Sequence, residues 1–213
     1  MTESYKIITE AGTGEIVEKK SRFIANVFYV SSQQEAEEKL AEIYKKYWDA
    51  KHNCYAYVIG VNGENTKCSD NGEPSGTAGK PILEVINGSG ITNILVVVTR
   101  YFGGVLLGTG GLVRAYTQAA QAGIAATKVG EMVYSQLLTL EVGYNMINNV
   151  KYYLSQNEIS ISAERYEVGV QYDICVREAE VQRITEGLTQ KCEGQIKIIE
   201  GTKDYYLISQ NQS

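Results

Sequence analysis

The sequence predicts an α+β protein with two domains, on the strength of three observations. The chain has 213 residues, which is enough for two modest hydrophobic cores. Most of its 21 glycines precede residue 131, so the composition changes within 128–132. Beyond that point the apolar pattern follows the order β-α-β-β-α-β, which is typical of a ferredoxin-like domain. We therefore expect an N-terminal domain over residues 1–130 and a ferredoxin-like C-terminal domain over 131–213.

Three stretches of the N-terminal domain predict strands. Residues 4–30 read as two or three strands with a turn at Gly12–Gly14. Residues 53–61 alternate between apolar and polar side chains and end at an Asn-Gly turn. Residues 94–102 form a nearly continuous apolar run, which indicates a strand buried on both faces.

One helix of this domain has a clear start signal. Apolar residues recur at helical spacing over 33–47. Ser31 or Ser32 is placed to cap this helix, and Glu35 is placed to close a capping box.

The C-terminal domain reads as six elements with short connections. Its two helices show helical spacing, and the middle strands form a pair with a turn near Glu167–Gly169. The expected order is strand 132–144, helix 145–157, strands 159–167 and 169–176, helix 178–192 and strand 195–209.

Charge differs between the two domains. Residues 1–130 carry 13 basic and 13 acidic residues, whereas residues 131–213 carry 7 basic and 12 acidic residues and hold the whole net charge of −5. A phosphate-binding surface spread over the C-terminal domain is therefore disfavoured. Any contact with nucleic acid should use a local basic patch on the N-terminal domain.

Several classes of protein are disfavoured by composition. No apolar run approaches the length of a membrane span, and the first residues lack the pattern of a signal peptide, so we expect a cytoplasmic protein without membrane contact. The four cysteines form no CxxC pair, and His52 is the only histidine. We expect no metal site and no cofactor.

The stretch DNGEPSGTAGKP, residues 70–81, holds both prolines of the chain. It is not a Walker A loop, because Pro74 replaces the first glycine and Pro81 replaces the hydroxyl that binds magnesium. A structural interpretation is a turn followed by a helix over 78–86, with Thr77 as its N-cap and Asn87-Gly88 at its end.

A functional interpretation of this stretch is an anion or ligand site. A helix start lined by small residues leaves backbone N–H groups free to bind an anion. The polar residues that crowd there are the candidates: Asp70, Glu73, Ser75, Thr77 and Lys80.

A second glycine-rich stretch runs from Arg100 to Arg114 and leads into a helix over 108–127, with Thr109 as a candidate N-cap. Free amides beside the two arginines suit a phosphate or a carboxylate. The alternative is that the glycines allow close helix–sheet packing while Arg114 pairs with Asp70 or Glu73. The glycines concerned are Gly103, Gly104, Gly108, Gly110 and Gly111.

His52 and Cys54 are two residues apart at a strand start, so they lie on one face of that strand. They are conceivable as a nucleophile–base pair. We favour the structural interpretation, in which the histidine binds a backbone group and the cysteine is buried.

Three motifs together resemble the bacterial members of the IMPACT family, the UPF0029 group. They are AKHNCYAY, SDNGEPSGTAGKP and VVVTRYFGGVLLGTGGLVRAY, within residues 50–116. The resemblance implies an N-terminal α/β fold of the ribosomal-protein type, as in the fourth domain of elongation factor G. It also implies a ferredoxin-like tail, similar to the fifth domain of that factor.

The resemblance implies a translation-associated regulator that binds RNA or the ribosome through its N-terminal domain. It assigns no catalytic residue. An alternative is an enzyme acting on a small anionic or peptide substrate at residues 70–80, with Lys80 and Arg114 as anion ligands. In that case Asp70 or Glu73 would act as acid or base, and Ser75 or Thr77 as nucleophile or donor. A third hypothesis is a protein partner on the open sheet face of the C-terminal domain.

The binding residues implied by the family motifs are His52, Asp70, Glu73, Ser75, Thr77, Lys80, Arg100, Gly103, Gly104, Gly108, Gly110, Gly111 and Arg114.

Overall fold

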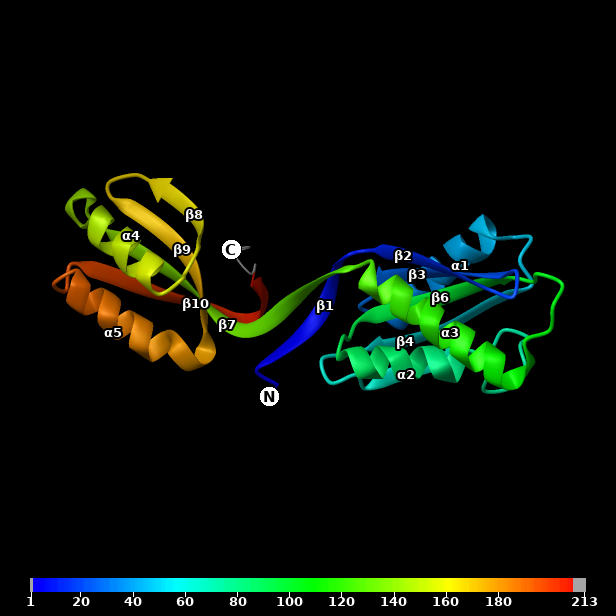
Figure 1. Cartoon of the computed structure of the whole chain (residues 1–213). Helices are drawn as coiled ribbons and strands as arrows, with labels where there is room; N and C mark the ends of the chain where they lie inside the picture. Colours follow the sequence, from blue (N-terminus) through cyan, green and yellow to red (C-terminus); the bar gives the residue numbers. More distant parts are fainter. Residues whose placement is uncertain (1, 209–213) are drawn as a thin grey trace. The chain divides into compact units, whose positions relative to one another are not determined.

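The computed structural model describes residues 2–208 of an α+β protein with two antiparallel sheets. The chain forms two compact units, 4–131 and 132–208 (Figure 1). The division falls inside one continuous strand, β7 (Lys128–Val142), and not in a loop. Strand β1 (Ser4–Glu10) pairs with β7, and the Thr9 hydroxyl donates to the Lys128 carbonyl.

The N-terminal unit is built on a five-stranded sheet whose neighbouring strands are all antiparallel. In spatial order the strands are β2 (Gly12–Glu18), β3 (Ser21–Tyr29), β6 (Ile94–Tyr101), β4 (His52–Ile59) and β5 (Asn65–Ser69). Arg100 on the central strand β6 lies opposite Phe23 on one side and His52 on the other.

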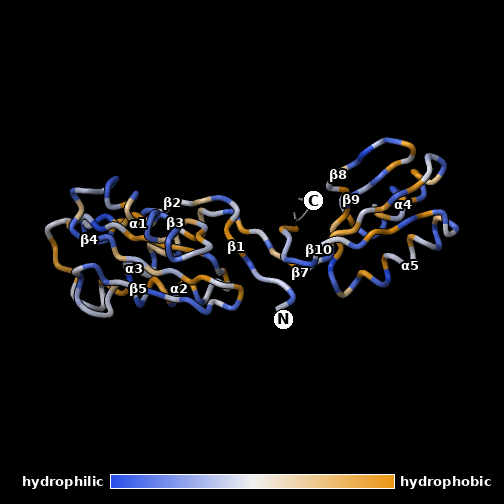
Figure 2. Tube along the Cα trace, turned by 180° about the vertical axis from the view of Figure 1, so that it is seen from behind, coloured by the Kyte–Doolittle hydropathy of each residue, from blue (hydrophilic) through white to orange (hydrophobic). Residues whose placement is uncertain are grey.

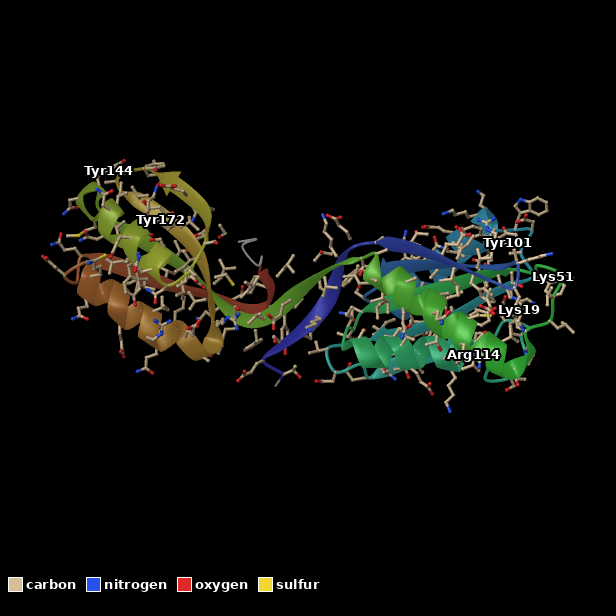
Figure 3. The ribbon with its side chains drawn as sticks, in the orientation of Figure 1. Lys19, Lys51, Tyr101, Arg114, Tyr144 and Tyr172 are labelled. Carbon is tan, nitrogen blue, oxygen red and sulfur yellow. The ribbon has the colours of Figure 1, made fainter. Side chains whose placement is uncertain are left out.

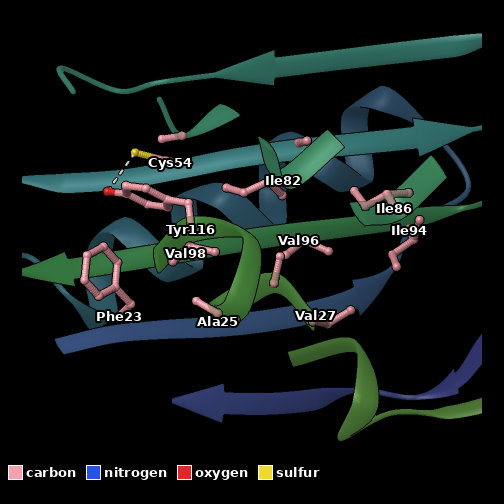
Figure 4. Close-up of a cluster of buried hydrophobic side chains, with 14 of the residues drawn as sticks. Phe23, Ala25, Val27, Cys54, Ile82, Ile86, Ile94, Val96, Val98 and Tyr116 are labelled. Carbon is pink, nitrogen blue, oxygen red and sulfur yellow. Dashed lines mark hydrogen bonds between the residues drawn. The ribbon is translucent and has the colours of Figure 1, made fainter. Parts of the chain in front are cut away.

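Helices cover both faces of this sheet. The helix α1 (Gln33–Lys46) packs on one face, and α2 (Gly79–Ser89) and α3 (Gly108–Ala125) cover the other (Figure 1). Figure 4 shows side chains from β3, β6, α2 and α3 meeting in the larger cluster. Successive residues of β6 alternate between the two clusters, and its residues 94–100 are all buried. The prediction of a strand buried on both faces is confirmed.

The predicted turn at Gly12–Gly14 is wrong. Both glycines lie within β2 and allow α3 to pack against it, since a Cβ on Gly14 would stand 2.4 Å from the Ala122 carbonyl carbon. The turn is instead Lys19-Lys20, which joins β2 to β3 with positive φ angles of 46° and 67°. Two such residues make a type I′ hairpin turn, which usually carries Asn-Gly.

The capping box of α1 is confirmed. The Ser32 hydroxyl accepts from the Glu35 amide at 3.2 Å, and the Glu35 carboxylate accepts from the Ser31 amide at 2.7 Å. The other predicted caps are wrong. The N-cap of α2 is Ala78, not Thr77, and that of α3 is Leu107, not Thr109, and neither of these two residues caps its helix with its own side chain.

The α2 helix also continues through the predicted end at Asn87-Gly88. Its last residue is Ser89, and Gly90 follows in the left-handed conformation with φ of 68°. Glycine adopts this conformation without steric cost, which is why it ends many helices.

The C-terminal unit has the predicted β-α-β-β-α-β order. Its helices bury their apolar sides in one cluster, while the other sheet face carries polar pairs such as Thr139 with Asp173. The elements are the later part of β7, α4 (Ile147–Gln156), β8 (Ile161–Tyr166), β9 (Val170–Arg177), α5 (Val181–Lys191) and β10 (Ile196–Ile208), and the strands lie in the order β10-β7-β9-β8. Within residues 2–208, no helix is long and apolar enough to cross a membrane.

Candidate functional site

The two glycine-rich stretches meet at one end of the N-terminal sheet through a buried ion pair. Arg100 Nη1 donates to Glu73 Oε1 at 2.7 Å, and the two side chains are only 8% and 4% exposed. The Arg100 Nε has no hydrogen-bond partner among residues 2–208. The alternative interpretation paired Arg114 with Asp70 or Glu73, but the partner of Glu73 is Arg100. This pair fixes the two stretches to each other.

A polar network extends from the same carboxylate into the core. The Tyr116 hydroxyl donates to Glu73 Oε1 at 2.8 Å, and the Cys54 sulfur lies 2.9 Å from the Asp70 carbonyl oxygen. Figure 4 shows the contact between the Cys54 sulfur and the Tyr116 hydroxyl, which are 3.3 Å apart. Burial raises the pKa of the Cys54 thiol to about 12 and also raises the pKa of Tyr116. Cys54 is therefore a protonated structural thiol and not a nucleophile.

His52 has the structural role that we favoured. Its Nδ1 lies 3.0 Å from the Asn71 carbonyl oxygen, while the Asn71 side chain accepts from the Asn53 amide at 2.8 Å. These bonds hold the residue 70–73 turn against the start of β4.

Asp70 occupies the helix start that was expected to hold an anion. Its carboxylate accepts from the amides of Gly76, Ala78 and Gly79 at 2.8, 3.0 and 2.9 Å. Burial raises the pKa of Asp70, but these amides outweigh it and hold the pKa below its ordinary value. The expectation of free amides at this start is thus wrong, because an aspartate of the chain already binds them.

The other residues of this stretch divide between internal and exposed positions. The Thr77 hydroxyl donates to the Pro74 carbonyl at 2.6 Å, so it stabilises the turn before the helix. Ser75 and Lys80 are exposed, and no polar partner is recorded for either within the described chain.

The second stretch is anchored at its beginning and open beyond it. The Gly103 amide donates to the Ser21 hydroxyl at 3.1 Å, and a Cβ at Gly103 would stand 2.0 Å from the Lys20 carbonyl carbon. Past this point Gly104 has open space around it, and Leu106 is 83% exposed. Figure 2 shows the hydrophobic stretch in this loop between β6 and α3. A loop with an apolar, exposed tip is a common feature of contact surfaces.

The glycines of the α3 start do not support close packing. A Cβ on Gly110 would meet only the Arg114 side chain, at 3.9 Å, and one on Gly111 would meet Leu107 at 3.1 Å. Close packing of α3 depends on Gly123, where a Cβ would be 2.7 Å from the Ala25 Cβ. Gly108 and Gly110 are exposed, so they leave the first turn of α3 open to solvent.

Four exposed cations surround the open loop: Lys19, Lys20, Lys51 and Arg114. Lys20 adjoins Gly103, Lys51 precedes the β4 residue opposite Arg100, and Figure 3 shows Lys19, Lys51, Tyr101 and Arg114 at one end of the unit. None of the four forms an ion pair within residues 2–208. We call these cations and the loop 102–107 the basic end.

The basic end has an excess of available positive charge. Glu73 is bound to Arg100 and Asp70 to backbone amides, so neither acid forms an ion pair with these four cations. Sequence reasoning missed Lys19, Lys20 and Lys51, although Lys-Lys between two predicted strands is a visible signal. Only the register of β3, β4 and β6 places these lysines beside the loop.

The histidine and the thiol near this end are bound within the protein. No group of three His, Cys, Asp or Glu side chains in the described chain is placed to hold a metal ion. The one histidine faces a backbone carbonyl, and the nearby thiol is buried. An exposed basic surface with a glycine-rich loop can bind an anionic polymer.

Fold and site together define a two-domain α+β protein with a basic, glycine-rich end on its first domain. Residues 19–124 match the Impact N-terminal domain, and residues 140–195 match a domain of unknown function, DUF1949. The chain belongs to the IMPACT family.

The similarity extends over nearly the whole chain. It is 39% identical over 205 residues to the IMPACT family member YvyE of Bacillus subtilis, covering 96% of this chain and 94% of the relative. It is 33% identical over 182 residues to an IMPACT family member of Haemophilus influenzae, covering 84% of this chain and 88% of the relative. A crystal structure of a hypothetical protein matches 93% of this chain and 98% of its own, with a TM-score of 0.62 and 31% identity.

Proposed function

We propose that this protein is a translation-associated regulator that binds RNA or the ribosome through the basic end of its N-terminal unit. The observation that carries the proposal is the set of four unpaired cations around an exposed glycine-rich loop. The family resemblance points in the same direction, since it implies translational folds. The strand order of the second unit, β10-β7-β9-β8, suits the ferredoxin-like fold that we propose for it.

The proposed contacts differ from those expected from the motifs alone. Arg100 is buried and ion-paired, so its role is to hold the loop and not to touch phosphate. Lys19, Lys20, Lys51 and Arg114 are free to contact phosphate oxygens, and the open glycines let a backbone approach closely. Binding by such contacts is largely electrostatic and independent of sequence.

The enzyme alternative finds less support in the geometry. Asp70 and Glu73, the candidate acid and base, are both bound by the protein itself. The proposed protein partner of the second unit remains a prediction. The open sheet face there already carries ion pairs of its own, including Lys197 with Glu141 and Arg165 with Asp173.

Binding of RNA and of ribosomes across a salt series tests the proposal. We expect the affinity of the wild type to fall steeply with salt, and Lys19→Gln/Lys20→Gln to bind more weakly with a shallower salt slope, by roughly 0.7 per lost single-strand phosphate contact. Both lysines are exposed and unpaired.

Lys6→Gln/Lys67→Gln is the matched control, since both lysines are also exposed and unpaired but lie elsewhere. The backbone of Lys6 forms an isolated β-bridge with Ile91, which precedes β6, and Lys67 lies on the edge strand β5. Equal losses in the two double variants would contradict the placement of the contact. No binding at low salt would contradict the proposed function.

A further inference from the structure

The loop 102–107 has an apolar tip, Val105-Leu106, that the protein leaves uncovered. Leu106 is 83% exposed and Val105 is 43% exposed. The next residue, Leu107, is the N-cap of α3 and packs against the larger apolar cluster of the unit. Gly111 leaves room for this packing, since a Cβ there would stand 3.1 Å from the Leu107 Cβ. The exposed Leu106 therefore stands directly at the start of a packed helix.

Two glycines lie on either side of the tip and leave open space beside it. Gly104 and Gly108 have φ angles of 84° and 69°, a conformation that glycine adopts without steric cost. A Cβ at either position would meet no atom within 4 Å other than its chain neighbours. The backbone on both sides of Leu106 is therefore accessible to a molecule from outside the chain.

Cations stand at both ends of the same loop. At its start Gly103 lies against Lys20, because a Cβ there would be 2.0 Å from the Lys20 carbonyl carbon. Beyond its end a Cβ on Gly110 would be 3.9 Å from the Arg114 Nη1, so the guanidinium lies beside the first turn of α3. Neither Lys20 nor Arg114 forms an ion pair in the described part of the chain, and Figure 3 shows Lys19 and Arg114 at the same end of the unit. The apolar tip thus has a free positive charge on each side.

This order of charge and apolar surface suits a polyanion that exposes apolar faces between its phosphates. A continuous RNA duplex does not, because its bases are stacked and its major groove is too deep and narrow for side chains. An unpaired nucleotide in a bulge exposes its base next to the phosphates of the flanking helices. Several proteins that bend DNA insert leucine or another apolar side chain between bases, so such a contact is physically sound.

We propose that the basic end binds RNA where unpaired nucleotides interrupt a helix, and that Leu106 packs against an unpaired base; this inference rests on the proposed function. Lys20 and Arg114 contact the phosphates on either side of that base. An uncharged apolar partner would leave these two cations unsatisfied. A lipid surface is less favoured, because one leucine buries much less apolar surface than a single acyl chain, which by itself gives only marginal membrane binding.

The experiment titrates the protein with two RNA hairpins that carry the same number of phosphates. One hairpin is continuous, and the other has a short adenosine bulge that contains 2-aminopurine. We expect the bulged hairpin to bind more tightly by about tenfold, as for the partial burial of one leucine side chain. Binding should also change the 2-aminopurine fluorescence, which reports on the surroundings of the bulged base.

Leu106→Ser removes the apolar side chain at an exposed position, so the fold should be unaffected. This variant should bind both hairpins with the affinity that the wild type has for the continuous one, and without the change in fluorescence. Val168→Ser is the matched control, since Val168 is a fully exposed apolar residue in the turn between β8 and β9 of the other unit. It should behave as the wild type does.

Three outcomes would overturn the inference. Equal, salt-sensitive binding of both hairpins that Leu106→Ser does not change would overturn it while the proposed RNA binding stands. Absence of binding to either hairpin at low salt would remove the proposed function and this inference with it. Binding to vesicles of anionic phospholipid that requires Leu106, without binding to either hairpin, would assign the tip to a lipid surface.

Discussion

The two glycine-rich loops of the N-terminal unit have similar compositions and opposite structural roles. In the loop of residues 70–80, Asp70 and Glu73 bind backbone amides and Arg100, so its charges are used inside the protein. In the loop of residues 102–107, only the beginning is anchored, and the tip is exposed. The first loop builds a scaffold and the second presents a surface, a difference set by where the partners of their polar groups lie.

The largest effect should come from breaking the ion pair between the two loops. Glu73→Ala leaves the buried Arg100 guanidinium without its only ion-pair partner within residues 2–208, and should destabilise the N-terminal unit by about 3–5 kcal/mol. Urea unfolding measures this change. Glu15→Ala breaks the exposed pair with Arg22 and is the control, with an expected loss of about 0–1 kcal/mol. Equal losses would mean that the buried pair is not structural.

The next largest effect should be a difference in unfolding free energy between alanine at Gly103, where the loop is anchored, and alanine at Gly104, where it is free of contacts. Gly103→Ala forces a Cβ into the Lys20 backbone and should cost about 2–3 kcal/mol in unfolding free energy. Gly104→Ala meets no atom within 4 Å but places alanine at φ of 84°, and should cost about 1 kcal/mol. Thermal unfolding of both variants checks the order, and a reversal would show that the loop is not anchored at Gly103.

The loop of residues 70–80 should make the free energy of unfolding depend on pH, whereas the loop of residues 102–107 should not. The pKa of Asp70 is below its ordinary value of 3.8, so its stabilising contribution is present above that value and is lost as the pH falls through the lower folded pKa. Asp70→Asn should cost about 1–2 kcal/mol near neutral pH, as for the loss of a helix cap, and the difference from wild type should shrink in acid.

Urea unfolding from pH 7 to below pH 3 measures this difference. Asp49→Asn is the control, since Asp49 is exposed and accepts from a single hydroxyl. A difference between wild type and Asp70→Asn that persists unchanged in acid would show that the charge of Asp70 does not stabilise the helix start.

The smallest effect should be a gain in stability at the turn beside the open loop. Lys19→Asn/Lys20→Gly supplies the residues that a type I′ turn prefers and should stabilise the unit by about 1 kcal/mol. The same variant should bind RNA more weakly, since two exposed cations are lost. Thermal unfolding measures the stability of this variant, and RNA titration measures its affinity. Together they test whether the two lysines lower the stability of the turn while they strengthen RNA binding. A variant that is more stable and binds equally well would show that the two lysines are not contacts.

Much of the fold could be predicted because its signals are local. The Ser32–Glu35 capping box, the apolar run of β6 and the element order of the second unit follow from residues close together in the sequence. The turn at Lys19-Lys20 and the position of Gly14 could not be predicted in this way. A glycine reads as a turn signal, and only the packing of α3 against β2 shows that Gly14 is needed inside a strand.

By itself the sequence determined the family, the two-domain α+β organisation and the two glycine-rich stretches of the candidate site. These depend on periodicity, caps and motifs, which are properties of neighbouring residues. The tertiary structure decided which polar groups of those stretches are used internally and which are exposed. Glu73 meets Arg100 across 27 positions and Gly103 meets Ser21 across 82, and such long-range contacts arise only when the sheet register brings the strands together.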